Sequence, residues 1–204
     1  MLIATLIAVH KCPTEWGQGI GEEFGAEDEE INFEPCFEFV CDPIRVRRYT
    51  NVLKEVRTYY RKYNRPGMPM SLEAKMMVLS NYMRVEFKEW DFVGFYYLNK
   101  ERSLDELEIG PYATIIKTPM PLFKKGQGIV GKVWEKEETI IVKNIATEKE
   151  YTTYDSRARS EMALPCFDLK GELFGVLKIY SELPNVFEET DQICLEEIIN
   201  YLDY

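Results

Sequence analysis

The chain contains stretches of helical and of strand-like apolar spacing. Before residue 64, apolar side chains recur at i, i+4, i+7 and i+11, which predicts an amphipathic helix with the face Val52, Val56, Tyr59 and Tyr63. A second helix should begin after Ser71, whose hydroxyl can cap it, and run to about Lys88. Its apolar face is Leu72, Met76, Leu79 and Met83. Thr190 should cap a last helix, with the apolar face Leu195, Ile198, Ile199 and Leu202.

Between the second and the last helix, aromatic and β-branched residues gather in short runs separated by turns, as is typical of strands. The predicted strands cover residues 92–98, 107–117, 139–145, 162–169 and 173–181. Residues 132–138 have a helical pattern, and residues 146–161 lack any apolar period and should form a long loop. Because tight turns join neighbouring strands, we expect an α+β fold, a central antiparallel sheet with N- and C-terminal helices packed on one face.

The clearest domain boundary lies at residues 64–70, where two prolines and a glycine can neither continue a helix nor enter a central strand. Residues 71–204 would then form the domain. Residues 1–70 would form an N-terminal extension with strands, an acidic loop and the basic helix. The extension opens with an apolar run at residues 1–9, which we interpret as a buried strand because it lacks the basic start of a targeting segment.

Charge and cysteine content narrow the function classes. The 204 residues carry a formal net charge of −10, which disfavours binding of the whole molecule to nucleic acid or to an anionic membrane. The five cysteines are odd in number and include no Cys-x-x-Cys pair, which favours a reducing, cytoplasmic setting. His10 is the single histidine of the sequence, so a metal site with several histidines is excluded. We interpret His10 as structural and expect no histidine-based catalytic triad. We therefore expect no metal and no cofactor.

The charge is unevenly distributed along the chain. An acidic tract spans Glu22–Glu34 with seven acids and no bases, and a basic tract spans Arg45–Arg65 with eight bases and one acid. The basic helix could bind a protein partner, and the arginines assigned to that role are Arg45, Arg47, Arg48, Arg57 and Arg61. Alternatively it could pair with the acidic tract of its own chain, which requires no association entropy.

Residues 126–131 spell Gly-x-Gly-x-x-Gly, the pattern of a phosphate-binding turn. A dinucleotide site needs a buried hydrophobic strand directly before the first glycine. Here the preceding residues 119–125 include two prolines and two lysines, which suit a central strand poorly. The pattern alone therefore does not indicate a nucleotide site.

Several stretches together resemble a GAF domain, and within that superfamily they are most similar to the free methionine-R-sulfoxide reductases. They are FVGFYYL, IGPY, GQGIVGKVW, YDSRARSEMALP and GELFGVLKIYSE followed by VFEETDQICLEEI, within about residues 71–204. The resemblance implies that Gly126, Gly128 and Gly131 are conformational residues, which turn the chain from the wall of a pocket into a short helix. No phosphate is then needed.

The resemblance also implies where the reductase chemistry would be. The family's cysteines fall on Val130, on Tyr154 and on a cysteine-free strand at residues 115–121, and two of its acids fall on Lys178 and Tyr180. The acids that do match are Asp155 and Glu161. Cys166 follows Pro165 in a strand and could face the pocket, but one thiol cannot complete a disulfide cycle. We therefore expect no catalytic residues and no enzyme activity.

The expected function is that of a non-catalytic GAF-type module, a protein-interaction or scaffold component of a larger assembly or a homodimer. A small ligand could also bind between the sheet and its loops, and replacing two acids by Lys178 and Tyr180 should favour an anionic one. The candidate lining residues are Tyr112, Lys117, Tyr154, Asp155, Arg159, Glu161, Lys178 and Tyr180. Two alternatives stay open: these side chains fill a collapsed pocket, or the chain is a redox enzyme related to the sulfoxide reductases.

Overall fold

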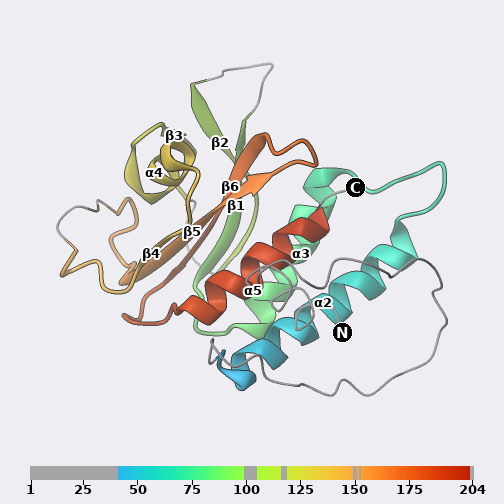
Figure 1. Cartoon of the computed structure of the whole chain (residues 1–204), viewed down its shortest axis with the longest axis horizontal. Helices are drawn as coiled ribbons and strands as arrows, with labels where there is room; N and C mark the ends of the chain where they lie inside the picture. Colours follow the sequence, from blue (N-terminus) through green and yellow to red (C-terminus); the bar gives the residue numbers. More distant parts are fainter. Residues whose placement is uncertain (1–40, 99–104, 116–118, 149–150, 152, 203–204) are drawn as a thin grey trace, which may run out of the picture.

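The computed structural model describes residues 41–98, 105–115, 119–148, 151 and 153–202. Six strands form one antiparallel sheet in the order β3-β2-β1-β6-β5-β4 (Figure 1). The strands are β1 (Phe92–Leu98), β2 (Glu106–Thr114), β3 (Leu122–Lys124), β4 (Ile140–Val142), β5 (Ser160–Phe167) and β6 (Leu173–Ser181). The predicted α+β fold with a central antiparallel sheet is confirmed.

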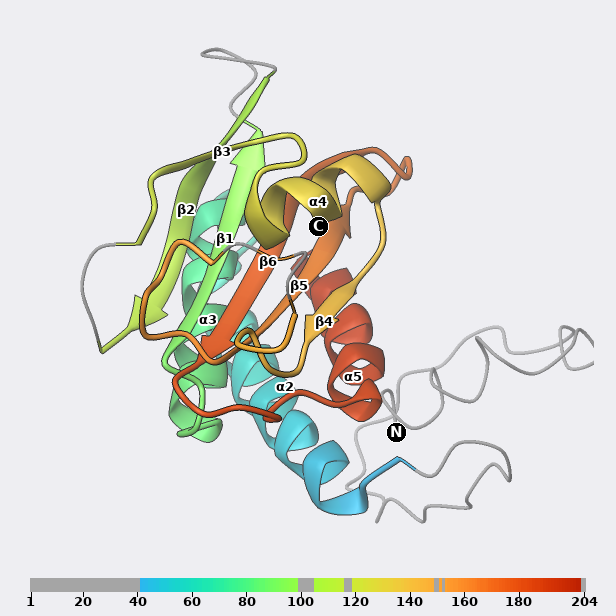
Figure 2. The ribbon, with the colours of Figure 1, turned by 90° about the vertical axis from the view of Figure 1, so that its left-hand side faces the viewer.

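Helices cover both faces of this sheet, unequally. Three helices pack on one face and α4 packs on the other (Figure 2). The helices are α2 (Pro43–Tyr63), α3 (Leu72–Glu86), α4 (Gly128–Lys136) and α5 (Glu189–Ile199), with a short 3-10 turn η1 (Asn200–Leu202) after α5. The predicted packing of N- and C-terminal helices on one face is therefore observed, and we call the two sides the three-helix face and the α4 face.

The central strands β1 and β6 face apolar surroundings on both sides, which explains their nearly continuous hydrophobic sequences. Along β1, Val93 and Phe95 point into the core under the three helices, whereas Phe92 and Tyr96 belong to the second core under α4. Side chains of successive strand residues alternate between faces. The sheet therefore separates two cores.

Helix α2 is part of the main core. Its buried residues are Val46, Tyr49, Val52, Leu53 and Val56, and it packs against α3 and α5. The predicted apolar face was correct at Val52 and Val56, but Tyr63 at its C-terminal end is 44% exposed. The domain boundary at residue 70 stays a prediction, although the helix before it shares the core of the residues after it.

The caps of two helices were predicted, one correctly. Ser71 caps α3 by accepting a hydrogen bond from the N–H of Ala74, and α3 ends at Glu86, two residues before the predicted end. The N-cap of α5 is Glu188, which forms a capping box with Asp191. The prediction of Thr190 was wrong because its hydroxyl accepts the N–H of Asp42 at 3.2 Å and so joins α2 to α5.

Local patterns missed two features. Strand β3 was not predicted, and α4 begins at Gly128, inside the glycine loop rather than after it. The predicted strand at residues 1–9, the acidic tract Glu22–Glu34, His10 and Lys117 lie outside the described residues. No helix in the described part of the chain has the length and apolar character needed to cross a membrane.

Candidate functional site

The glycine loop connects β3 to α4, and its glycines are required by backbone geometry. Gly126 and Gly128 have φ angles of 74° and 59°, in the left-handed region that glycine adopts at low cost. A Cβ atom at Gly131 would collide with the carbonyl oxygen of Lys124. The N–H of Gly126 donates to the carbonyl of Gly131 at 2.9 Å, which closes the loop on itself.

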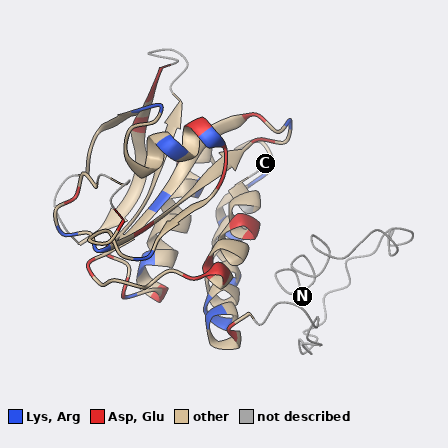
Figure 3. Ribbon diagram, turned by 60° about the vertical axis from the view of Figure 1, so that its left-hand side comes forward, with Lys and Arg blue, Asp and Glu red and all other residues tan. Residues whose placement is uncertain are grey.

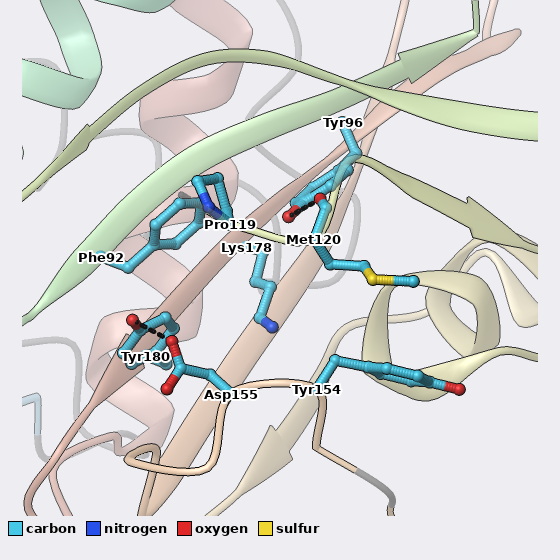
Figure 4. Close-up of a pocket in the computed structure, with 8 residues that line it drawn as sticks. All are labelled: Phe92, Tyr96, Pro119, Met120, Tyr154, Asp155, Lys178 and Tyr180. Carbon is cyan, nitrogen blue, oxygen red and sulfur yellow. Dashed lines mark hydrogen bonds between the residues drawn. The ribbon is translucent and has the colours of Figure 1, made fainter. Parts of the chain in front are cut away.

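A small cavity lies on the α4 face of the sheet, between β1, β6 and two loops (Figure 4). Its lining residues are Phe92, Tyr96, Pro119, Met120, Tyr154, Asp155, Lys178 and Tyr180. The cavity has a volume of about 40 Å³. Ordinary ligand pockets have volumes of about 300–1,000 Å³, so a ligand of ordinary size requires lining side chains to move.

Tyr180 and Asp155 form the hydrogen bond at one end of the cavity. The phenol of Tyr180 donates to Oδ2 of Asp155 at 2.5 Å, and its ring stacks on Phe92 with centroids 5.4 Å apart. Burial, with help from the bond to Asp155, raises the pKa of Tyr180 above its ordinary value. The phenol therefore stays protonated and holds the loop that carries Asp155 against β6.

Lys178 and Glu161 form a buried ion pair beside the cavity. Nζ of Lys178 lies 3.4 Å from Oε1 of Glu161, and both side chains are almost completely buried. The hydroxyl of Thr153 donates to the same carboxylate oxygen at 2.7 Å. The ammonium also lies 5.7 Å from the ring centroid of Phe123 and 5.6 Å from that of Tyr180. These contacts place one cation between a carboxylate and aromatic rings.

Aromatic side chains form the opposite wall. The phenol of Tyr96 donates to the carbonyl of Met120 at 3.0 Å, which fixes the entry to β3. Burial raises the pKa of Tyr96, so it too remains a neutral donor. The ring of Tyr154 meets Phe123 edge-on at 5.5 Å and is 43% exposed. Together with Met120, 36% exposed, it forms the outer edge of the cavity.

The structure brings four of the eight predicted ligand-binding residues to the cavity: Tyr154, Asp155, Lys178 and Tyr180. Glu161 lies behind Lys178, and Tyr112 stacks on the cavity residue Phe92 at 5.9 Å. Arg159 is exposed and donates to nearby loop carbonyls, such as that of Ser156 at 3.1 Å, so it does not line the cavity. Lys117 lies outside the described residues.

Sequence reasoning missed half of the lining residues. Phe92 and Tyr96 could have been found, because on β1 they alternate with the residues that enter the main core, and so face the α4 side. Pro119 and Met120 reach the cavity because β3 pairs with β2, and no local signal for β3 was recognised.

The described cysteines lie away from the cavity. Cys166 and Cys194 are buried in the main core on the three-helix face, and Cys41 packs against that core. The expectation that Cys166 could face the pocket was wrong, because neighbouring strand residues alternate and Cys166 points to the other side of the sheet. Burial raises the pKa of the Cys194 thiol, which disfavours its reactive thiolate form.

The arginines assigned to partner binding fall into two groups. Arg45 donates to Asp191 at 2.5 Å, and Arg48 donates to Glu89 at 2.6 Å, so both act within the molecule. Arg57 is half-buried. Arg47 and Arg61 are exposed on the outer side of α2, whose basic residues appear in Figure 3.

Comparison with known proteins identifies the family to which this fold belongs. The chain matches the family model of the GAF domain over residues 78–202 and therefore belongs to the GAF family. A solved GAF domain that is 19% identical to the chain has the same fold, with a TM-score of 0.65 over 76% of this chain and 86% of its own.

Three relatives illustrate the family. GAF domain-containing protein A of Dictyostelium discoideum is 32% identical over 112 residues, which cover 55% of this chain and 67% of that protein. Protein YtsP of Bacillus subtilis is 25% identical over 118 residues, covering 56% and 68%. Free methionine-R-sulfoxide reductase from Neisseria meningitidis, solved in complex with its substrate, is 26% identical, with a TM-score of 0.65 over 76% of this chain and 85% of its own.

Proposed function

We propose that the chain is a non-catalytic GAF regulatory module that binds a small anionic ligand in the cavity on the α4 face and contacts a protein partner in a larger assembly. The observation that carries the ligand proposal is the position of Lys178. Its side chain is buried, with 5% of the residue exposed, and its ammonium points into the cavity (Figure 4).

The hydrogen-bonding capacity of Lys178 supports an anion as ligand. An ammonium group has three donors and no acceptor. In the described structure its carboxylate neighbour is Glu161 at 3.4 Å, and that oxygen also accepts from Thr153. A buried donor without a partner costs free energy. A ligand oxygen beside Nζ would accept a hydrogen bond from a donor that Glu161 does not use, and this bond would favour binding.

The groups around Lys178 favour a ligand with a single negative charge and a small apolar part. Glu161 and Asp155 repel a ligand that carries more than one negative charge. One carboxylate oxygen of Asp155 accepts from the phenol of Tyr180. The aromatic walls offer apolar contact to the rest of the ligand, and the exposed edge at Tyr154 and Met120 can move outward to admit it. A monocarboxylate with a short apolar tail fits this arrangement best.

Titration calorimetry with a panel of small carboxylates tests this proposal. We expect at least one to bind the wild-type chain, and Lys178→Met to weaken it about tenfold or more, as loss of a charge-assisted hydrogen bond predicts. Lys170→Met is the matched control, because Lys170 is exposed in the turn between β5 and β6. Absence of binding across the panel, or equal binding by both variants, would reject the ligand.

The non-catalytic part of the proposal rests on the positions of the cysteines. Those described lie on the three-helix face, and the cavity residues include none. The alternative, a redox enzyme, is favoured by the similarity to the Neisseria meningitidis reductase. We expect no turnover of free methionine-R-sulfoxide in the presence of a thiol reductant. Turnover that is lost in Cys166→Ser would support the enzyme instead.

The protein-partner part of the proposal rests on the outer side of α2, where Arg47 and Arg61 are exposed. Exposed cations that are not paired within the described structure are available to a partner with acidic groups. Affinity capture from native lysate should retain a stoichiometric protein on the wild-type chain and lose it on Arg47→Glu/Arg61→Glu. Equal capture by the two would place the contact elsewhere.

A further inference from the structure

The basic residues of α2 divide between two sides of the helix. Arg45 and Arg48 face inward to Asp191 and Glu89, and their contacts anchor α2 to the core. Arg47, Lys54 and Arg61 are exposed. These three are spaced seven residues apart, so they lie along one line of the helix surface. We call Arg47, Lys54 and Arg61 the outer basic stripe.

The stripe has the dimensions of a binding surface for an extended segment. From Arg47 to Arg61 the helix rises about 21 Å at 1.5 Å per residue. The positions between the bases on the same line, Asn51 and Thr58, are exposed and polar. A chain laid along the stripe would therefore meet alternating cationic and neutral polar groups.

The sequence contains a segment with the complementary charge. Glu22–Glu34 carries seven acids and no bases, and it lies in the part of the chain that the structure does not describe. Glu34 precedes Asp42, the N-cap of α2, by eight residues. Eight residues can span up to about 28 Å, so the tether permits the acidic tract to reach the whole stripe.

We propose that the acidic tract Glu22–Glu34 docks on the outer basic stripe of its own chain and covers it. Covalent linkage holds the acidic tract near the stripe at an effective concentration in about the millimolar range. An untethered acidic partner of equal affinity would need a higher concentration to compete. Each exposed ion pair is weak, so the cover is reversible and sensitive to salt. A partner with higher charge density could displace it.

Zero-length carbodiimide cross-linking of the full chain tests the cover, because this reagent joins a carboxylate to an amine only at direct contact. We expect Lys54 to form amide links to acids in Glu22–Glu34. The yield should fall about tenfold when salt is raised from about 0.05 M to about 1 M, since the Debye length shortens to about 3 Å. Lys170, exposed in the turn between β5 and β6, is the internal control and should form no such link.

Two further experiments decide whether the links form within one molecule and whether they depend on the stripe. Mixing isotope-labelled with unlabelled chain distinguishes links within one molecule from links between two copies. Arg47→Glu/Arg61→Glu should reduce the yield of Lys54 links without changing thermal stability. The control variant Lys136→Glu/Lys170→Glu makes the same charge change at exposed positions outside α2 and should leave the yield of Lys54 links unchanged. Links between copies, links at Lys54 no more frequent than at Lys170, or equal yields in both variants would overturn the proposal.

Discussion

Two ion pairs in the described part of the chain include a buried carboxylate, Asp191 on the three-helix face and Glu161 on the α4 face, and they differ in their hydrogen-bond partners. On the three-helix face, Asp191 is fully buried and accepts from Arg45 at 2.5 Å, from the phenol of Tyr49 at 2.8 Å and from the N–H of Glu188 at 2.8 Å. On the α4 face, the Lys178–Glu161 distance is 3.4 Å, and the ammonium borders a cavity.

If the proposed ligand site is correct, the difference separates a pair that holds two helices together from a pair that also serves binding. The guanidinium of Arg45 also donates to the carbonyl of Val186 at 3.1 Å, so its fork of donors is used to join α2 to α5. Lysine is a compact charge with rotatable donors, and the proposed function assigns the remaining donors of Lys178 to a ligand. We therefore expect removal of a carboxylate to cost more stability at the first pair than at the second.

The largest effect should come from Asp191→Ala. This change removes the buried carboxylate that accepts from Arg45 and Tyr49, and with it the capping box of α5, while Arg45 keeps its bond to the carbonyl of Val186. Breaking such a buried pair costs about 3–5 kcal/mol, measurable by urea unfolding. Glu196→Ala, at an exposed position of the same helix, is the control and should cost about 1 kcal/mol, because it loses only exposed hydrogen bonds from Thr139 and Gln192. Similar losses in both variants would show that the pair does not anchor α2.

An intermediate effect is expected for Glu161→Gln. The amide oxygen can still accept from Thr153, but Lys178 loses its carboxylate, so we expect a loss of about 1–3 kcal/mol. In the double variant Glu161→Gln/Lys178→Met no unpaired charge remains. Its loss should be smaller than the sum of the two single losses by about 1 kcal/mol. Additive losses in urea unfolding would mean that the two groups do not interact.

The smallest effect concerns Glu89, at the edge of the three-helix face. Burial alone would raise its pKa, but the hydrogen bond and charge of Arg48 outweigh burial, so the pKa lies below its ordinary value of 4.5. The unfolded state then binds a proton more readily than the folded state, and stability is lost as pH falls below about 4.5. Glu89→Gln should cost about 1 kcal/mol at pH 7 and less at acidic pH.

Thermal unfolding of the wild type and of Glu89→Gln measures how this difference in stability depends on pH. The scan runs from about pH 7 to about pH 3, where carboxylates titrate. Glu138→Gln, at an exposed position after α4, is the matched control and should match the wild type throughout. A difference between Glu89→Gln and the wild type that stays constant with pH would contradict the role assigned to Arg48.

Local sequence patterns determined the fold class and most of the elements, with β3 and the start of α4 as the exceptions. The stripes of α3 and α5 and the alternation in β1 and β6 reflect burial on particular faces, and such periods repeat within a few residues. The glycines at 126, 128 and 131 were interpreted correctly as conformational, because their requirement lies in the turn itself. Together with the GAF resemblance, these patterns were sufficient to identify the family.

Tertiary structure alone decided which groups meet. Tyr49 and Asp191 are 142 positions apart, and Asp42 and Thr190 are 148 apart, so no local period could reveal the first contact or the loss of Thr190 as a cap. The side of the sheet chosen by Cys166, the division of the α2 arginines and the pairing of Lys178 with Glu161 depend likewise on strand register and helix packing. A residue's type sets what it can bind, but its partners follow from contacts between elements far apart in the chain.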